Sequence, residues 1–258
     1  MNKYIEFYEK QDRENVYSGG MNPKEHKFNN VLTSAGKILN INNPKVLEIG
    51  AGNGRFQDVF KDYTGIDITE NSRKYFHKNY VVVVDGEEYP FKDKEFDLIF
   101  TNAVFEHIPC LDIALQEMIR VANNKGVIVF NPAWQCRPWA TNGYQVRPYS
   151  DFNMFEKIYK ASIPIRENML IRLSYVIPKR AYYLIKFLIK PNSFKEKIVY
   201  KKIKANYDIF WQSDADACNS IDPFLAILYF RAKGLKILNY PTLLQQFLVR
   251  TNELILKK

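Results

Sequence analysis

Three glycines at alternate positions follow a short apolar run near the start of the chain. The stretch Val46–Phe56 reads VLEIGAGNGRF and places Gly50, Gly52 and Gly54 directly after the apolar residues. Glycine lets the backbone turn sharply and approach a ligand closely, because it presents no side chain. A dinucleotide-binding fingerprint needs its third glycine at the next position, where this chain has Arg55. The spacing predicts a ligand-cradling loop and argues against NAD or FAD.

Polar residues end the next apolar runs in the same way. Asp67 ends YTGID, Asp85 ends YVVVVD and Asn102 ends FDLIFTN. A carboxylate at the end of a second strand can accept hydrogen bonds from both hydroxyls of a ribose. In a doubly wound sheet the carboxyl ends of neighbouring strands open onto one crevice. These residues and the glycine loop therefore predict one nucleoside-binding cleft.

His107 and Glu106 are the candidate catalytic residues. They lie in FEHIP, just beyond the fourth apolar run and so at the mouth of the predicted crevice. Imidazole titrates near neutral pH, so His107 can remove a proton from an acceptor or position it. The alternative is that Glu106 only begins a helix and that His107 has no catalytic role. His26 precedes the first helix of the core, in a segment that could close over the site.

An α/β framework is needed to bring these residues together. Apolar positions recur at helical spacing over Phe28–Leu39, and five short apolar runs bounded by turn residues follow. Their alternation with segments of helical character predicts right-handed βαβ crossovers and a mostly parallel sheet with helices on both faces. The expected strands are VLEIG, YTGIDIT, YVVVVD, FDLIFTN and GVIVFNPA, and the expected helices between them are Arg55–Lys61, Glu70–Lys78 and Leu111–Ala122.

The pattern changes after Pro132. An aromatic, arginine-bearing loop leads into a basic helical stretch, which we expect to form an inserted cap. Regular alternation then returns, with a helix near Pro223–Lys233, a strand at Lys236–Tyr240 and a final hairpin of QQFLVRT and LILKK. This organisation predicts an N-terminal lid segment (1–30), a ligand-binding core (31–133), the cap (134–207) and a C-terminal part that completes the sheet (208–258).

The positive charge of the chain is concentrated in the cap. Of the formal net charge of +9, residues 155–204 contribute 13 Lys or Arg against 3 Asp or Glu, while the rest is close to neutral. A local basic excess attracts an anionic partner: a phosphate-bearing substrate, a lipid headgroup or a nucleic acid. A solvated helix face is the alternative without a partner.

Composition bounds the class of protein. A hydrophobic content of 47% over 258 residues supports a sizeable buried core. The three cysteines are far apart and form no C-x-x-C pair, so neither a disulfide framework nor a zinc site is indicated. The first twenty residues lack the apolar core of a signal peptide. We therefore expect a cytoplasmic globular protein.

The motifs between Lys45 and Pro132 resemble those of class I S-adenosylmethionine (SAM)-dependent methyltransferases of the type-11-like, small-molecule branch. The resemblance rests on VLEIGAGNG, the acid after the second strand, DGEEYPF and FDLIFTNAVFEHI, which occur in this order. It implies a Rossmann-like α/β fold, with a mostly parallel seven-stranded sheet and a C-terminal antiparallel hairpin. It also implies SAM as cofactor and S-adenosylhomocysteine (SAH) as product. Methyl transfer from a sulfonium needs no metal, and we expect none.

The resemblance assigns parts of the cofactor to parts of the cleft. Glu48 and the glycine loop would hold the methionine part, and Asp67 the ribose. The residues at Asp85 would lie beside adenine, and those at Asn102 near the sulfonium. For Glu48 and Asp85 the alternative is a capping role at the strand ends. The cofactor-binding set is Glu48, Gly50, Ala51, Gly52, Gly54, Asp67, Ile68, Asp85, Gly86, Glu87, Asn102 and Ala103.

Aromatic and arginine side chains in the loop after Pro132 are the candidates for binding the acceptor. Aromatic faces and guanidinium groups suit a sugar and a phosphate, and the alternative is that the tryptophans form the core of the cap. The stretch from PAWQCRPW to SDADACNSID resembles methyltransferases of bacterial surface polysaccharides, including the type that methylates the capsular O-methyl phosphoramidate group. This implies a sugar-linked or anionic small-molecule acceptor. The acceptor-binding set is His26, Trp134, Arg137, Trp139, Arg147 and Tyr149.

Other functions compete with this interpretation. The chain could methylate another small molecule or an RNA, although no RNA-binding module is evident and we expect no nucleic-acid partner. It could instead lie on an anionic membrane surface through Tyr182–Lys190. NPAW at Asn131 is similar to the NPPY of enzymes that methylate amino groups of nucleic acids, but theirs follows the fourth strand, and here the fourth strand ends in TNAV. We therefore exclude an adenine N-methyltransferase.

Overall fold

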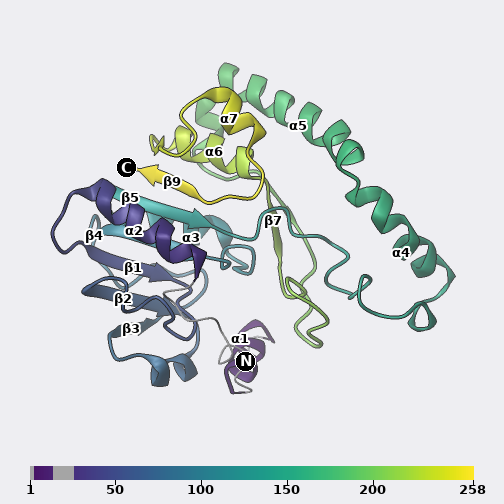
Figure 1. The fold of residues 1–258 in the computed structure, drawn as a ribbon, viewed down its shortest axis with the longest axis horizontal. Coiled ribbons are helices and arrows are strands. Elements are labelled where there is room, and N and C mark those ends of the chain that lie inside the picture. Colours follow the sequence, from purple (N-terminus) through teal and green to yellow (C-terminus); the bar gives the residue numbers. More distant parts are fainter. Residues whose placement is uncertain (1–2, 14–25) are drawn as a thin grey trace.

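A seven-stranded sheet forms the centre of the computed structural model, which describes residues 3–13 and 26–258. The strand order is β3-β2-β1-β4-β5-β9-β8 (Figure 1). The first five strands are parallel, whereas β9 runs antiparallel to both β5 and β8. The predicted α/β fold is confirmed. The strands are β1 (Lys45–Ile49), β2 (Asp62–Asp67), β3 (Asn79–Val82), β4 (Phe96–Asn102), β5 (Ala122–Asn131), β8 (Lys236–Ile237) and β9 (Leu254–Lys257).

Helices cover both faces of the sheet, as the alternation predicted. Successive residues of a strand point to opposite faces, so Val127 and Val129 pack with α2 (Lys27–Leu39) while Ile128 and Phe130 pack with α3 (Leu111–Val121) and α6 (Pro223–Ala232). The strands are therefore apolar on both sides, as parallel strands between two helical layers must be.

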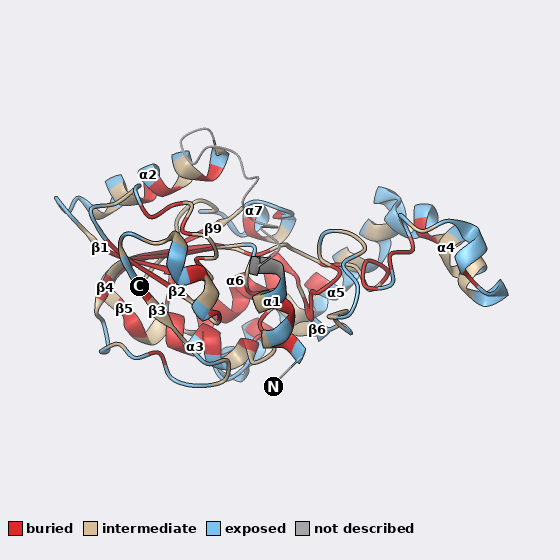
Figure 2. Ribbon diagram, turned by 90° about the horizontal axis from the view of Figure 1, so that it is seen from below, coloured by how far each residue is buried: buried red, intermediate tan, exposed pale blue. Residues whose placement is uncertain are grey.

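The inserted cap extends away from this body as a helical arm (Figure 2). A short 3₁₀ helix η3 (Tyr149–Asp151) leads into α4 (Met154–Glu167), and α5 (Met169–Ile189) returns to the body and ends at η4 (Pro191–Phe194). Asn153 caps α4 in a capping box with Glu156, and Asn168 caps α5. A small cluster of Trp139, Tyr144, Phe152 and Ile163 is the buried part of the arm's far end.

The C-terminal part differs from the prediction in one element. QQFLVRT is not a strand: its first residues belong to α7 (Leu243–Leu248), which Thr242 and Gln245 cap in a capping box. The antiparallel partner of β9 is β8 instead, so Asn252 and Glu253 do not form a hairpin turn. A two-stranded antiparallel sheet of β6 (Tyr200–Lys202) and β7 (Asn219–Ile221) was not predicted.

Two of the predicted helices are also irregular. Turns replace the expected helix at Arg55–Lys61, and the segment expected to be helical at Glu70–Lys78 forms the 3₁₀ helix η2 (Glu70–Tyr75). The helix α2 crosses the predicted boundary at residue 30. The described part of the predicted lid includes α1 (Lys3–Arg13), and most of the remaining lid lies outside the described residues. Within the described part of the chain, no helix combines the length and the hydrophobicity of a membrane span.

Candidate functional site

The carboxyl ends of β1 to β4 open onto a cleft of about 410 Å³. Eleven of the twelve predicted cofactor residues line this cleft, and only Gly54 does not. Their individual contacts with a cofactor stay predictions. Segments outside the parallel strands that also line the cleft include α1 at Tyr4 and Tyr8, the loop at His107, and part of residues 210–216.

The glycine loop turns tightly against β2. The backbone N–H groups of Gly50 and Ala51 both donate to the Ile66 carbonyl, at 2.8 and 3.0 Å. Gly50 has φ +73°, and a Cβ there would lie 2.3 Å from the side chain of Val104. A Cβ on Gly52, with φ +51°, would meet nothing within 4 Å. Gly50 therefore serves the close packing of the loop, whereas Gly52 leaves bare backbone beside open space.

Gly54 and Asp67 hold the loop in shape. Gly54 has φ +70° and closes a turn by donating to the Ala51 carbonyl at 2.9 Å. The carboxylate of Asp67 accepts hydrogen bonds from the backbone N–H groups of Gly52 (2.8 Å) and Ile68 (2.7 Å). Asp67 thus fixes the loop to the end of β2 while it lines the cleft, so the same carboxylate that would bind a ribose also orders the loop below it.

Glu48 is a buried acid at the floor of the cleft. Its side chain accepts a hydrogen bond from the Tyr63 hydroxyl, and the residue is 4% exposed. Burial raises the pKa of Glu48 to about 8. A cationic group in the cleft would favour the ionised form, which fits the predicted contact with the amino group of the methionine part.

The ends of β4 and of the third strand are also held by hydrogen bonds. Ala103 has φ +54°, a conformation that non-glycine residues rarely adopt, and its N–H donates to the Asn131 carbonyl at 2.8 Å. The Asn131 side chain donates to Asn102 at 2.8 Å. Asp85 accepts from the N–H of Cys110 at 3.2 Å. The backbone at Ala103 is therefore strained where the resemblance places the sulfonium.

His107 lies among carboxylates at the mouth of the cleft. Its Nδ1 is 3.2 Å from Oδ2 of Asp216 and its Nε2 is 3.5 Å from Oε1 of Glu106. Tyr8 donates to Asp216 at 2.5 Å. Burial alone would lower the pKa of His107, but Asp216 and Glu106 raise it well above its ordinary value. The two acids thus favour the protonated form of His107, which cannot accept a proton.

A distant segment supplies the acids beside His107. The side-chain amide of Asn219, at the start of β7 (Asn219–Ile221), donates to the carbonyls of Phe105 (3.0 Å) and Ile108 (2.7 Å). The backbone N–H of Asn219 donates to the carbonyl of Glu106. These bonds place the preceding turn, with Asp214 at φ +63°, against the loop that carries His107.

The residues that line the cleft and that sequence reasoning missed include Tyr4, Tyr8, Asp214 and Asp216. The pair of acids in SDADA, within an otherwise basic half of the chain, was the available signal for the last two. The sequence held no comparable signal for Tyr4 and Tyr8.

A second cavity, of about 540 Å³, adjoins the cleft. It lies between the loop after β5, helix α5 and the residues after α7, and it shares Ser213 and Asp214 with the cleft. Four arginines line it, and Arg180 pairs with Asp222, which leaves three others: Arg137, Arg172 and Arg250. None of the three forms an ion pair with any residue that the structure describes. Burial and the charge of Arg172 lower the pKa of Arg137, which indicates a local excess of positive charge.

The predicted acceptor residues are spread over several places. Trp134 and Arg137 line the second cavity. Trp139 belongs to the small core of the arm, and Tyr149 is exposed beside Lys160. Two more are engaged elsewhere: Arg147 pairs with Asp151 at 3.3 Å, and His26 caps α2 through Phe28. Of this set the structure brings Arg137 together with Trp134 in the second cavity and with Trp139, whose ring centroid lies 5.7 Å from the Arg137 guanidinium.

Comparison with known proteins identifies the domain that holds the cleft. Residues 47–130 match a family model described as a methyltransferase domain. This segment is a SAM-dependent methyltransferase domain. It spans β1 to β5 and carries every predicted cofactor residue. The predicted cofactor, SAM, and the predicted class of enzyme agree with this match.

Individual relatives resemble parts of the chain. An uncharacterised protein of Methanocaldococcus jannaschii is 38% identical over 85 residues, 32% of this chain and 42% of that protein. The malonyl-[acyl-carrier protein] O-methyltransferase of Methylococcus capsulatus is 29% identical over 100 residues, 34% of this chain and 36% of that protein. The chain thus covers less than half the length of each. A solved SAM-dependent methyltransferase of Thermotoga maritima, described as a possible histamine N-methyltransferase, aligns with 98% of this chain and 92% of its own at 14% identity and a TM-score of 0.46.

Proposed function

We propose that the chain transfers the methyl group of SAM to an oxygen of an anionic small molecule. The acceptor is a sugar-linked compound that carries a phosphate or phosphoramidate group and serves the synthesis of capsular or other surface polysaccharide. The second cavity carries this proposal, because three arginines without ion-pair partners among the described residues line it. The link with polysaccharide rests on the resemblance of the sequence alone.

The position of the second cavity fits a transfer between two bound molecules. Ser213 and Asp214 belong to the walls of both cavities, so a donor and an acceptor would meet beside them. In methyl transfer the acceptor oxygen attacks the methyl carbon in line with the breaking C–S bond, the sulfur keeps the electron pair, and the hydroxyl proton leaves. The two cavities supply the alignment, and Arg137 and Arg172 would fix the anionic end of the acceptor by charge-assisted hydrogen bonds.

Binding of the cofactor is the first test. SAH at saturating concentration should raise the melting temperature of the protein by several degrees, because a ligand that binds only the folded state stabilises it. Asp67→Ala should abolish the shift, since it removes the predicted ribose contact and a support of the loop. The absence of any shift with the unaltered protein would overturn the proposal.

The acceptor is tested with a panel of sugar phosphates, nucleotide-linked sugars and uncharged sugars, with release of SAH as the readout. Arg172→Gln should raise the KM for an anionic acceptor about tenfold or more, because losing one charge-assisted hydrogen bond weakens binding by about that factor. The Kd of SAH should stay unchanged. Arg166→Gln, on the same arm but outside the cavity, is the matched control. Methylation of uncharged sugars alone would contradict the anionic acceptor.

A contact with an anionic membrane surface is a second candidate property, and the arm favours it. Its exposed side chains include Phe155 (85% exposed), Leu170 (72%) and Ile189 (78%). Residues 154–189 also carry seven Lys or Arg against two Glu. A second copy of the arm would bring like charges together, whereas an anionic lipid surface would match both the charge and the apolar side chains.

A further inference from the structure

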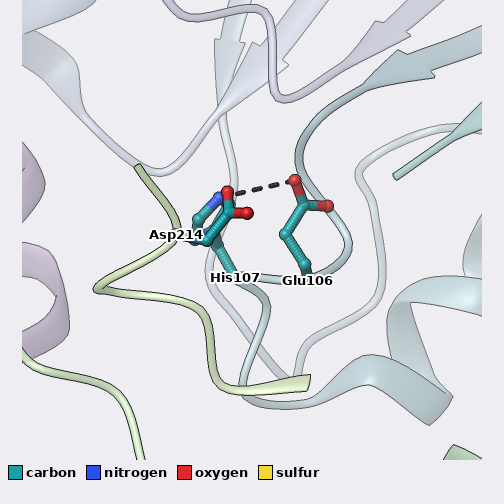
Figure 3. A group of neighbouring side chains, drawn as sticks. All are labelled: Glu106, His107 and Asp214. Carbon is teal, nitrogen blue, oxygen red and sulfur yellow. Dashed lines mark ion pairs between the residues drawn. The ribbon is translucent and has the colours of Figure 1, made fainter. Parts of the chain in front are cut away.

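Glu106, His107 and Asp214 form a compact cluster (Figure 3). His107 and Asp214 line the cleft, and Asp214 also lines the second cavity. Glu106 and His107 belong to the loop between β4 and α3, and Asp214 to the turn before β7. One donor atom from each side chain can be chosen so that all three lie within 4.8 Å of one another. Two carboxylates and an imidazole at this separation are a donor set for a divalent cation, which would need an inward movement of about half an ångström per ligand to reach ordinary ligand distances.

Glu106 has no partner that accounts for its burial. The residue is 0% exposed, and neither of its carboxylate oxygens has a hydrogen-bond partner among the described residues. The nearest cationic atom is Nε2 of His107, at 3.5 Å, which is too long for a hydrogen bond of ordinary strength. A fully buried carboxylate costs several kcal/mol unless a charge or hydrogen bonds compensate it. The geometry therefore leaves a place for a positive charge beside Glu106.

The charges around the cluster do not balance. The carboxylates of Glu106, Asp214 and Asp216 surround a single imidazole. No Lys or Arg of the described chain forms an ion pair with any of the three. Even with His107 charged, this group of side chains has an excess of negative charge in a half-buried place. A divalent cation would neutralise that excess.

The ring of His107 lies much as the ring of a metal-binding histidine does, although its Nδ1 contacts Asp216 as an ion pair without hydrogen-bond geometry. Such a histidine donates its second ring N–H to a carboxylate or carbonyl, which fixes the tautomer and turns the other nitrogen toward the ion. Here Nδ1 faces Asp216 at 3.2 Å, and Tyr8 in turn donates to Asp216. Nε2 is left facing Glu106 and the cluster.

We propose that Glu106, Nε2 of His107 and Asp214 bind one divalent cation of the Mn²⁺ type, and that Asp216 orients the imidazole ring. Ligands of mixed carboxylate and imidazole character suit Mn²⁺ better than Ca²⁺, which prefers oxygen ligands alone. The proposal departs from the expectation that no metal takes part, and it makes His107 a ligand in place of a proton acceptor; the cation would displace the Nε2 proton to solvent. If the proposed function holds, a cation here lies where the two cavities meet and would lower the pKa of the acceptor's hydroxyl group.

Titration with Mn²⁺, followed by electron paramagnetic resonance, tests the site in the absence of any acceptor. The full chain is treated with EDTA, freed of the chelator and titrated, and we expect one bound Mn²⁺ per chain. Glu106→Gln and Asp214→Asn should each weaken binding by tenfold or more, and Asp216→Asn by a smaller factor. Asp208→Asn is the matched control, because Asp208 is an exposed acid paired with Lys3, and it should bind Mn²⁺ as the unaltered protein does.

Circular dichroism of each variant shows whether it is folded. If Glu106→Gln does not fold, Asp214→Asn, on a partly exposed turn, carries the test. No binding of Mn²⁺, or equal affinity in the unaltered protein and Asp214→Asn, would overturn the proposal. A parallel titration with SAH in EDTA separates the two proposals: SAH binding without Mn²⁺ binding rejects the cation site alone, and Mn²⁺ binding without SAH binding rejects the proposed function alone.

Discussion

Single residues of the cleft combine two tasks, and Glu48 shows the cost of doing so. Its carboxyl group lies at the end of β1, almost without contact with solvent, and the Tyr63 hydroxyl donates to it. A neutral residue of the same shape would be more easily buried there. The ionised form becomes favourable only when a cation enters the cleft. Glu48 therefore lowers the stability of the free protein and raises its affinity for a positively charged ligand.

The cost of burying the Glu48 carboxyl group should make the stability of the free protein depend on pH. Burial raises the pKa of Glu48 from 4.5 to about 8, so between these values the folded state binds more protons than the unfolded state. The free energy of unfolding should then fall as the pH rises from 5.5 to 7.5, by about 1 kcal/mol per pH unit from this group. Glu48→Gln, which can still accept a hydrogen bond from Tyr63, should remove this contribution. Urea unfolding of both proteins at three pH values measures it, and equal slopes would show that Glu48 is not the cause.

Residues of the cleft were predictable from the sequence only where local spacing defines them. The glycine loop and Asp67 lie within 18 residues of one another, and strand ends bring them together in any parallel sheet. Asp216 lies more than 100 positions after His107, and Tyr8 about 100 before it. The meeting of Asp216 with His107 depends on the side-chain bonds of Asn219, more than 100 residues from the carbonyls it binds. No periodicity in the sequence encodes such a contact.

Elements were predictable where the hydrophobic period was unambiguous. The five parallel strands and the helices α2 and α3 follow from it directly. QQFLVRT was misread because a short run of consecutive apolar residues resembles a strand. The capping box at Thr242 and Gln245, and the hydrogen bond from Gln246 to the Tyr240 carbonyl, start a helix there instead. A local backbone cap thus decides an element that the apolar pattern leaves ambiguous.

The arm of α4 and α5 exposes many apolar side chains. A lipid-binding experiment tests whether these side chains contact a membrane surface. Vesicles with an anionic phosphatidylglycerol fraction should sediment the protein, and neutral phosphatidylcholine vesicles should do so much less. The double variant Leu188→Ser, Ile189→Ser should lower the partition coefficient at least tenfold, because two exposed apolar side chains would no longer enter the interface. High salt should weaken binding as well, because it screens the basic residues.

Ile41→Ser is the control for these variants, since Ile41 is 46% exposed and lies outside the arm. Equal binding to neutral and anionic vesicles would remove the role of the basic residues. A dimer in solution that disappears in the double variant, without any vesicle binding, would assign the apolar surface to self-association instead.

At the scale of the whole molecule, the cleft is assembled from segments that are far apart in the chain. The methyltransferase domain supplies its floor, α1 supplies Tyr4 and Tyr8, and residues 210–216 supply the wall that adjoins the second cavity. The arm adds Arg172 and other residues to the second cavity but none to the cleft. A cofactor should therefore couple the core to α1 and to residues 210–216, and leave the outer arm unaffected.

Hydrogen–deuterium exchange with and without SAH measures this coupling directly. SAH should slow exchange several-fold in the strand ends of the core, in α1 and in residues 210–216, because a bound ligand suppresses the local opening of every segment that contacts it. Exchange in α4 should not change, since none of its residues lines the cleft. Asp67→Ala provides the control in which SAH should protect none of these segments. If SAH slows exchange in the core but not in α1, then α1 does not close over the cofactor, and Tyr8 acts only through its hydrogen bond to Asp216.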